Sequence, residues 1–195
     1  MQEPSIKRSL IEPSVAGIGI LTVFPNRLGN LGAIRVGDNL IRPGGHGTPY
    51  WLVFSRFDVK NRIQLETVLD ADLTDLIHDY IQNHLHALLR GSNEPWLFPG
   101  MTGGHKGLAT LSSQITKRIQ KATGLHVTVH QFRHAAAALI LRAKPGNYEY
   151  VRRILGHRNL QTTINFYVGL ETTQATQEFG EIVRRELRFD PEAAE

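Results

Sequence analysis

The stretch VHQFRHAAAALIL, residues 129–141, places three basic side chains in front of an apolar run. It predicts a helix from about residue 130 to 143. His130 and Arg133 are three residues apart, so they would share a face of that helix. Both would lie in the first turn, where unpaired backbone N–H groups and the positive end of the helix dipole favour an anion. The planar guanidinium matches two phosphate oxygens. The stretch therefore indicates a helix that enters the core and either presents cationic groups to an anion or uses the His130–Arg133 pair, as is more common for H-x-x-R alone, to cap its own start.

The composition narrows the class of protein. The chain has 195 residues and no cysteine, which excludes disulfides and thiolate metal sites. Its 22 Lys plus Arg against 18 Asp plus Glu permit a polyanionic partner without requiring one. The sequence has no apolar run of about 18 residues, the length of a membrane span. The N-terminal residues lack the apolar core of a signal peptide. We expect a cytoplasmic protein with no membrane partner.

Apolar spacing predicts an α+β fold, mainly α, with a small antiparallel sheet near the N-terminus. Two β-forming runs, YWLVFS and RIQLETVL, flank RFDVKN and predict a hairpin over residues 50–69. Residues 15–24 are apolar enough for a buried helix or strand. A three-residue spacing of Leu28, Leu31 and Ile34 predicts a helical face within 25–41. Further helices are expected over residues 70–88, 108–124, 148–156 and 171–189.

A second polar cluster follows in LGHRNLQTTINFY, residues 155–167. Gly156 is expected to end a helix, His157 stands just past that end, and Tyr167 comes ten residues later. Taken alone, each has an ordinary structural explanation, a histidine at a helix end and a half-buried tyrosine. The informative feature is the order along the chain: Arg, His-x-x-Arg, Leu-Gly-His, Tyr.

That order resembles the tyrosine recombinases, the phage integrase family. Their catalytic domain carries an early arginine, a hairpin lysine, H-x-L-R-H, L-G-H and a nucleophilic tyrosine. Here HQFRH (130–134) resembles the third element, with phenylalanine for the usual leucine, and LGHRNLQTTINFY has the usual spacing to the tyrosine. The stretch PNRLGNLGAIRVGD (25–38) puts Arg27 in the place of the early arginine. Asn30 stands where the family usually has an acidic residue. Lys60 is the best match to the hairpin lysine, and Arg56 competes with it because hairpin length varies.

The resemblance implies a site that cleaves DNA. Attack on a phosphodiester adds negative charge to the non-bridging oxygens. Arg27 and Arg133 would clamp these oxygens, and His157 would donate a further hydrogen bond. Tyr167 would be the nucleophile. A tyrosine hydroxyl is mostly neutral at pH 7, so it needs a base, and His130 is expected to accept its proton or to position the group that does.

The rest of the reaction follows from the same resemblance. Lys60 would protonate the leaving 5′-oxygen, and a 3′-phosphotyrosyl intermediate would then be attacked by a second strand's 5′-hydroxyl. Because the intermediate conserves the bond energy, no cofactor, ATP or metal is expected. Arg56, Arg62 and Arg158 neighbour the proposed site residues and are expected to contact the DNA backbone.

The resemblance also gives expectations about domains and partners. Residues 1–195 would form a single catalytic domain, with 1–14 as a lead-in. The N-terminal core-binding domain typical of the family is not expected within this chain. The partners would be double-stranded DNA and further copies of the chain, as a tetramer on DNA. The helix at 171–189 would fold back on its own core or dock on a neighbouring protomer.

Three other readings differ in chemistry or in class. A type IB topoisomerase-like enzyme would use the same residues without synapsis of two sites. A DNA-binding module that has lost catalysis is motivated by Asn30 and by the competing hairpin cations. A metal site at His84 and His86 is disfavoured, because residues two apart lie on different faces of a helix and no H-E-x-x-H pattern is present.

Overall fold

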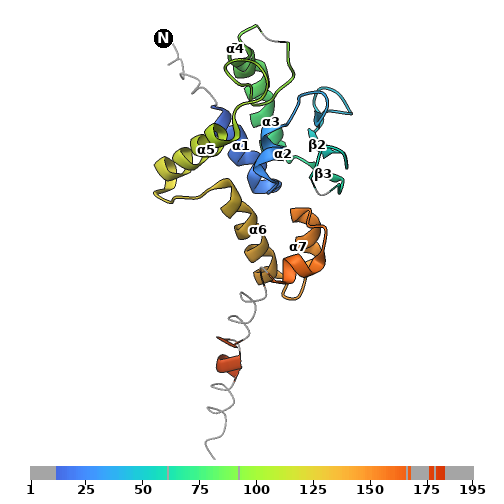
Figure 1. The fold of residues 1–195 in the computed structure, drawn as a ribbon, viewed down its shortest axis with the longest axis vertical. Coiled ribbons are helices and arrows are strands. Elements are labelled where there is room, and N and C mark those ends of the chain that lie inside the picture. The colour runs from blue at the N-terminus through green and yellow to red at the C-terminus, as the bar shows by residue number, and fades with distance from the viewer. Residues whose placement is uncertain are drawn as a thin grey trace, which may run out of the picture. The chain divides into compact units, whose positions relative to one another are not determined.

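A computed structural model describes residues 12–60, 62–91, 93–165, 167, 176–177 and 179–182. The chain divides into two compact units, residues 1–133 (unit 1) and 134–195 (unit 2). Helices dominate the described residues, and unit 1 contains a small three-stranded antiparallel sheet (Figure 1). The predicted fold class is therefore confirmed.

Helix α1 (Pro13–Val23) is central to unit 1 and resolves the choice left open for residues 15–24. It contacts α3 (Ala71–Tyr80) and α5 (Leu108–Thr123). Two glycines permit this close approach. A Cβ atom at Gly17 would lie 3.1 Å from the Ile115 side chain of α5, and one at Gly19 would lie 2.6 Å from the Leu73 side chain of α3. The glycines thus let both neighbouring helices pack against α1.

The predicted hairpin at 50–69 is confirmed as β2 (Trp51–Phe54) paired with β3 (Leu65–Val68), with Leu52 opposite Thr67. A third strand, β1 (Leu40–Ile41), completes the sheet by pairing with β2.

The helical spacing predicted within residues 25–41 is wrong beyond its first part. Helix α2 covers only Leu28–Gly32, and the chain then turns toward β1. Gly37 has a φ of 90° in this turn, a conformation that glycine adopts readily. The Asn39 side chain accepts a hydrogen bond from the Arg35 N–H and donates one to the Val53 carbonyl of β2. Pairing with the neighbouring strand therefore overrides the apolar spacing.

The helix predicted over 70–88 forms in three consecutive segments. Asp70 caps α3 by accepting a hydrogen bond from the Leu73 N–H at 2.8 Å. The π-helical turn η1 (Ile81–Leu85) follows, and then α4 (His86–Leu89). The predicted helix at 108–124 is α5, which ends at Gly124 with a φ of 75°.

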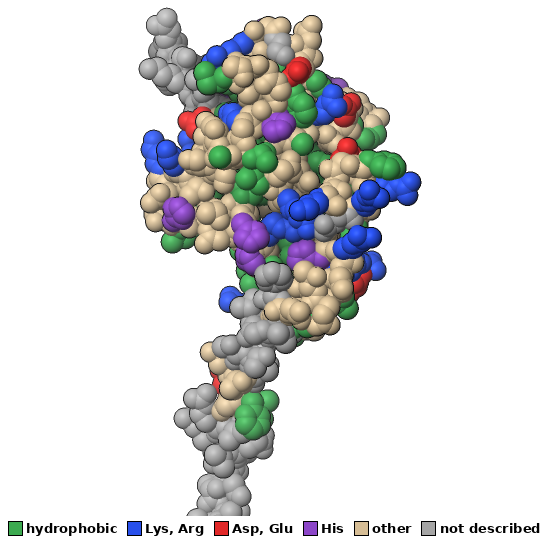
Figure 2. All heavy atoms as spheres, viewed as in Figure 1, with side chains coloured by type: hydrophobic (Ala, Val, Ile, Leu, Met, Phe, Trp, Pro, Cys, Tyr) green, Lys and Arg blue, Asp and Glu red, His purple; other side chains and the backbone are tan. Residues whose placement is uncertain are grey.

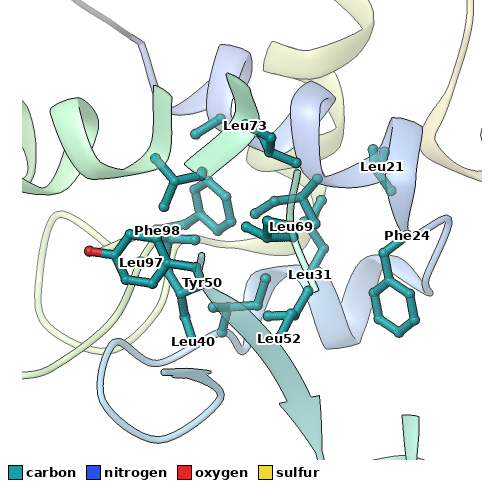
Figure 3. Packing of buried hydrophobic residues seen from close by; sticks show 14 of the residues in the cluster. Leu21, Phe24, Leu31, Leu40, Tyr50, Leu52, Leu69, Leu73, Leu97 and Phe98 are labelled. Atoms are coloured by element: carbon teal, nitrogen blue, oxygen red, sulfur yellow. The ribbon is translucent and has the colours of Figure 1, made fainter. Parts of the chain in front are cut away.

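The core of unit 1 is built from side chains of the helices, the sheet and the loop before α5. Figure 3 shows Leu31 of α2, Leu52 of β2 and Leu69 after β3 among this set. Leu97 and Phe98, from the loop between α4 and α5, are fully buried. The core thus joins segments that are distant in the sequence.

Unit 2 has a smaller core. Helix α6 (Val129–Ala143) crosses the division between the units, and its second half packs with α7 (Tyr148–Leu155). The buried residues of this core are Ala137, Leu141, Val151, Leu155 and Tyr167. Most of the helix predicted at 171–189 lies outside the described residues. Within the described part of the chain, no helix is long and apolar enough to cross a membrane.

Leu52→Ala should lower the free energy of unfolding by about 2–5 kcal/mol, because it removes a fully buried side chain from the centre of the sheet and leaves a cavity. Urea denaturation measures the change. Leu125→Ala, at a side chain that is 63% exposed, is the control and should change stability by less than about 0.5 kcal/mol. Equal effects of the two substitutions would contradict the assigned core.

Candidate active site

The start of α6 is fixed by a reciprocal cap. The Thr128 N–H donates to the Gln131 side chain at 2.7 Å, and the Gln131 N–H donates to the Thr128 hydroxyl at 3.4 Å. This is the arrangement of a capping box, which satisfies two backbone donors at a helix start. It places His130 and Arg133 in the first turns of the helix, as predicted. His130 is exposed, whereas Arg133 is only 6% exposed.

Arg133 is tied to a distant segment of unit 1. Its Nη1 donates a hydrogen bond of 2.7 Å to the carbonyl of Pro25. Pro25 lies two residues before Arg27, so the structure brings Arg133 to the segment that carries the other predicted arginine. Charge-assisted hydrogen bonds of this kind are stronger than neutral ones. The contact therefore fixes a buried guanidinium beside the start of α2.

Arg27 occupies the cap position of α2, where its carbonyl accepts a hydrogen bond from the Leu31 N–H. Partial burial lowers the pKa of Arg27 below its ordinary value. Arginine keeps its proton at physiological pH, so the shift reports a guanidinium that has lost part of its hydration. A partly desolvated cation interacts more strongly with an anion than one in bulk water.

Two buried amides flank Arg27. Asn26 is 1% exposed, and neither its Oδ1 nor its Nδ2 has a hydrogen-bond partner among the described residues. Asn30, the residue that replaces the family's acid, is also buried, and its Nδ2 is likewise unsatisfied within the described chain. Unsatisfied buried polar atoms destabilise a fold by about 1–3 kcal/mol each. This segment therefore holds two amides at a cost to stability.

The predicted hairpin cations lie on the turn between β2 and β3. Lys60, Arg56 and Arg62 are all exposed there. Val59 is buried and anchors the turn to the core. Lys60 and its competitor Arg56 thus share one exposed turn, four residues apart.

In unit 2, His157 follows the end of α7, which closes at Gly156 with a φ of 59° as predicted. The His157 Nδ1 lies 2.9 Å from the hydroxyl of Thr163, whose side chain is fully buried. When that hydroxyl donates to Nδ1, the proton of the neutral imidazole sits on Nε2. The contact then leaves Nε2 as the donor.

An ion pair supports the backbone of His157. Arg152 donates from Nε and Nη2 to both carboxylate oxygens of Glu149, at 2.6 and 2.8 Å. Its Nη1 donates to the His157 carbonyl at 2.9 Å. Hydrogen bonds from Arg152 and then Arg153 lower the pKa of Glu149 to about 2. Helix α7 thus positions His157 through a bridging arginine.

Tyr167 is 4% exposed, and its hydroxyl lies 3.3 Å from the Nδ1 of His134. The two rings meet edge to face, with centroids 5.8 Å apart. The sequence pattern assigned no role to His134, although it is the last residue of HQFRH. Thr163, Glu149 and Arg152 were also missed, because no sequence signal distinguishes them from ordinary helix residues. Within unit 2, the hydroxyl of the proposed nucleophile Tyr167 is therefore held by the His134 side chain.

The predicted residues are divided between the units. Arg27, Lys60, His130 and Arg133 belong to unit 1, and His157 and Tyr167 belong to unit 2. The predicted DNA contacts Arg56 and Arg62 in unit 1 and Arg158 in unit 2 are exposed. The described residues contain no group of three or more His, Cys, Asp or Glu side chains that could hold a metal ion. His84 instead faces Asp79, with its Nε2 3.7 Å from the carboxylate.

Asn26→Leu should raise the free energy of unfolding by about 1 kcal/mol, because it replaces two unsatisfied buried polar atoms by apolar ones. Asn39→Leu is the matched control. It removes a buried amide whose two hydrogen bonds are made, so it should lower stability. Urea denaturation distinguishes the signs, and a loss of stability in both variants would contradict the assignment of Asn26.

The ion pair of Glu149 should make the free energy of unfolding depend on pH in the acidic range. Its folded pKa of about 2 lies below the ordinary 4.5, so the ionised carboxylate stabilises the fold above pH 4.5. That contribution is lost as the pH falls from about 4.5 toward 2. In thermal unfolding over this range, the parent midpoint should fall more steeply than that of Glu149→Gln. Parallel pH profiles would contradict the ion pair.

Comparison with known proteins identifies the family of this chain. Residues 28–174 match the model of the phage integrase family. Arg27 lies one residue before the matched range. The match includes His130, Arg133, His157 and Tyr167. It covers about three quarters of the chain.

The individual proteins that this chain matches have low sequence identity to it. Transposase A from transposon Tn554 of Staphylococcus aureus is 26% identical over 143 residues, which are 72% of this chain and 38% of the relative. The chain thus spans well under half the length of that relative. The XerH site-specific recombinase in a post-cleavage complex with palindromic difH has a TM-score of 0.66 and 19% identity, over 88% of this chain and 46% of that one.

The XerA recombinase has a TM-score of 0.61 and 18% identity, over 91% of this chain and 66% of that one. At these identities the solved structures show a shared fold. The family itself rests on the matched residues 28–174 and on the motifs that they contain. The chain belongs to the phage integrase family.

Proposed function

We propose that this chain is the catalytic domain of a site-specific tyrosine recombinase, which breaks and rejoins double-stranded DNA with Tyr167 as nucleophile. The observation that carries the proposal is the pairing of the Tyr167 hydroxyl with His134 at 3.3 Å, within a chain that belongs to the phage integrase family. A buried tyrosine whose hydroxyl is held by an imidazole is oriented for attack. We place the action of the protein in the cytoplasm.

In the proposed first step the Tyr167 oxygen attacks the scissile phosphorus. A 3′-phosphotyrosyl bond forms, and the bond from phosphorus to the 5′-oxygen breaks. Lys60 supplies the proton that this oxygen takes, and His130 accepts the tyrosine proton. His134 orients the hydroxyl before attack. In the second step a 5′-hydroxyl attacks the phosphotyrosine and restores the DNA backbone. Each step exchanges one phosphoester for another, so the chemistry needs no ATP.

The cationic residues stabilise the charge that develops. Arg133, held by the Pro25 carbonyl, and Arg27 bind the non-bridging oxygens. His157 donates from Nε2 when the Thr163 hydroxyl donates to Nδ1. Arg133 and His157 are each held by a hydrogen bond within their own unit before DNA binds, so each side chain needs little local reorganisation during the reaction. Arg56, Arg62 and Arg158 bind flanking phosphates, which makes the affinity depend on salt.

Assembly on DNA is part of the proposal. Recombination requires synapsis of two sites, and we expect a tetramer. Of the helix predicted at 171–189, the described residues Phe179 and Ile182 are 66% and 52% exposed. They are three residues apart and so share a helix face. That exposed apolar pair favours docking on a neighbouring protomer over packing on the chain's own core.

A second candidate function is a DNA-binding relative that has lost catalysis. Asn30, buried with an unsatisfied Nδ2, favours it, because the amide supplies no negative charge to the neighbouring arginines. This candidate binds the same DNA without forming a covalent bond to it.

A nicked suicide duplex that carries the ends of the host element separates these candidates. The parent protein should form a protein–DNA adduct that survives denaturation, and Tyr167→Phe should form none. Tyr150→Phe, at an exposed tyrosine of α7, is the matched control and should form the adduct as the parent does. Gel electrophoresis after denaturation measures the adduct.

Two outcomes would change the proposal. An adduct that persists in Tyr167→Phe would show that another residue is the nucleophile. Retained DNA binding with no adduct in the parent would favour the non-catalytic relative. A protein–DNA species whose amount rises with concentration, and which contains two duplexes, would support recombination over relaxation of single duplexes.

A further inference from the structure

The turn between β2 and β3 exposes an aromatic ring. Phe57 is 81% exposed, the highest value among the described large apolar side chains that lie on the surface. Two residues later Val59 is 4% exposed and anchors the same turn in the core. The turn is thus attached to the fold through one apolar side chain while it presents another to solvent.

Local hydrogen bonds hold the turn in this form. The Ser55 N–H donates to the Asp58 carboxylate at 2.9 Å, and the Asp58 N–H donates to the Ser55 carbonyl at 3.0 Å. The Phe57 N–H donates to the Ser55 hydroxyl at 3.3 Å. The acidic group of the turn is therefore engaged with the backbone, and the ring projects from a preformed loop.

The surroundings of the ring are cationic. The Arg56 guanidinium lies 4.8 Å from the centroid of the Phe57 ring, a cation–π contact, and Lys60 and Arg62 are exposed on the same turn. Figure 2 shows Lys and Arg side chains over the part of unit 1 that carries this hairpin. An exposed aromatic ring among cations suits nucleic acid, since the cations meet phosphates and the ring meets bases.

We propose that Phe57 wedges against a base step of the DNA beside the scissile phosphate, while Arg56 and Arg62 bind the phosphates on either side. The position rests on the proposed function, in which Lys60 protonates the leaving 5′-oxygen. Phe57 is three residues from Lys60, a chain length of at most about 10 Å. The two side chains each add about 5 Å to this reach, so the contacted step lies within about six base pairs of the cleaved bond, at 3.4 Å per base pair.

The wedge would help the reaction and add specificity. Partial unstacking beside the cleaved bond loosens the strand end that must leave before a second strand attacks. Pyrimidine–purine steps unstack most easily, so the contact would favour such a step near the cleavage point without any hydrogen bond to a base.

Fluorescence of 2-aminopurine, placed singly at each position within about six base pairs of the nick in the suicide duplex, tests the wedge. The adenine analogue brightens when it is unstacked. Binding is measured in a Tyr167→Phe background, and adduct formation is measured with the tyrosine intact. The variants are Phe57→Ala, Phe57→Trp and the control Met101→Ala, which removes a side chain that is 77% exposed on another loop of unit 1.

The parent and Met101→Ala should brighten the probe at one or two adjacent positions. Phe57→Ala should lose this signal, bind about tenfold more weakly and form the adduct more slowly. Phe57→Trp should restore the fluorescence signal, the affinity for DNA and the rate of adduct formation. Thermal unfolding should be unchanged in every variant, since both side chains are exposed.

The inference would be overturned if Phe57→Ala kept the fluorescence signal and the DNA affinity of the parent. It would also be overturned if this substitution changed only the oligomeric state, because the ring would then contact protein. Absence of an adduct in both the parent and Met101→Ala would count against the proposed recombinase function. The fluorescence and affinity would still decide whether Phe57 contacts DNA.

Discussion

The hydrogen bond from Arg133 to the carbonyl of Pro25 joins positions 108 residues apart in the chain. On one side lies the capped start of α6, and on the other the short segment that leads from α1 into α2. The same segment carries Arg27. Without this contact, a buried guanidinium would lack one of its compensating acceptors, and burying a charge without partners is costly. The fold of unit 1 therefore depends on a contact that also fixes the predicted phosphate ligand.

In unit 2 an arginine side chain likewise joins separate positions of the chain, over a shorter distance in the sequence. Arg152 bridges the Glu149 carboxylate and the His157 carbonyl, so one guanidinium connects the first turn of α7 to the residue beyond its end. Thr163 and His134 then hold the His157 and Tyr167 side chains. In each unit a side chain expected to touch DNA is itself held by protein groups. Such preorganisation suits stabilisation of a charged transition state, because the protein dipoles need not move during the reaction.

The segment that leads from α1 into α2, which carries Arg27, also contains features that lower the stability of the fold. Next to Arg27, both side-chain polar atoms of Asn26 and the Nδ2 of Asn30 are buried without a hydrogen-bond partner among the described residues. A fold selected for stability alone would place apolar side chains there. The hairpin shows a related pattern, since Phe57 exposes a large apolar ring that contributes little to the core. Some departures from the ordinary rules of burial thus lie beside residues of the proposed site.

Local sequence determined much of this protein. The pattern predicted the helix from about residue 130, the end of α7 at Gly156 and the β2–β3 hairpin, because all three depend on interactions within a few residues. The Thr128–Gln131 cap at the start of α6 is one such interaction. The order of the motifs indicated the family. Tertiary structure decided the rest. Residues 33–41 leave the helical pattern because β1 pairs with β2 and the Asn39 side chain hydrogen-bonds to Val53. Arg133 donates to the Pro25 carbonyl, 108 residues away in the chain. The pairing of His134 with Tyr167 across 33 residues likewise has no local signal. Contacts between distant residues depend on how packed elements meet in space, which short-range periodicity does not encode.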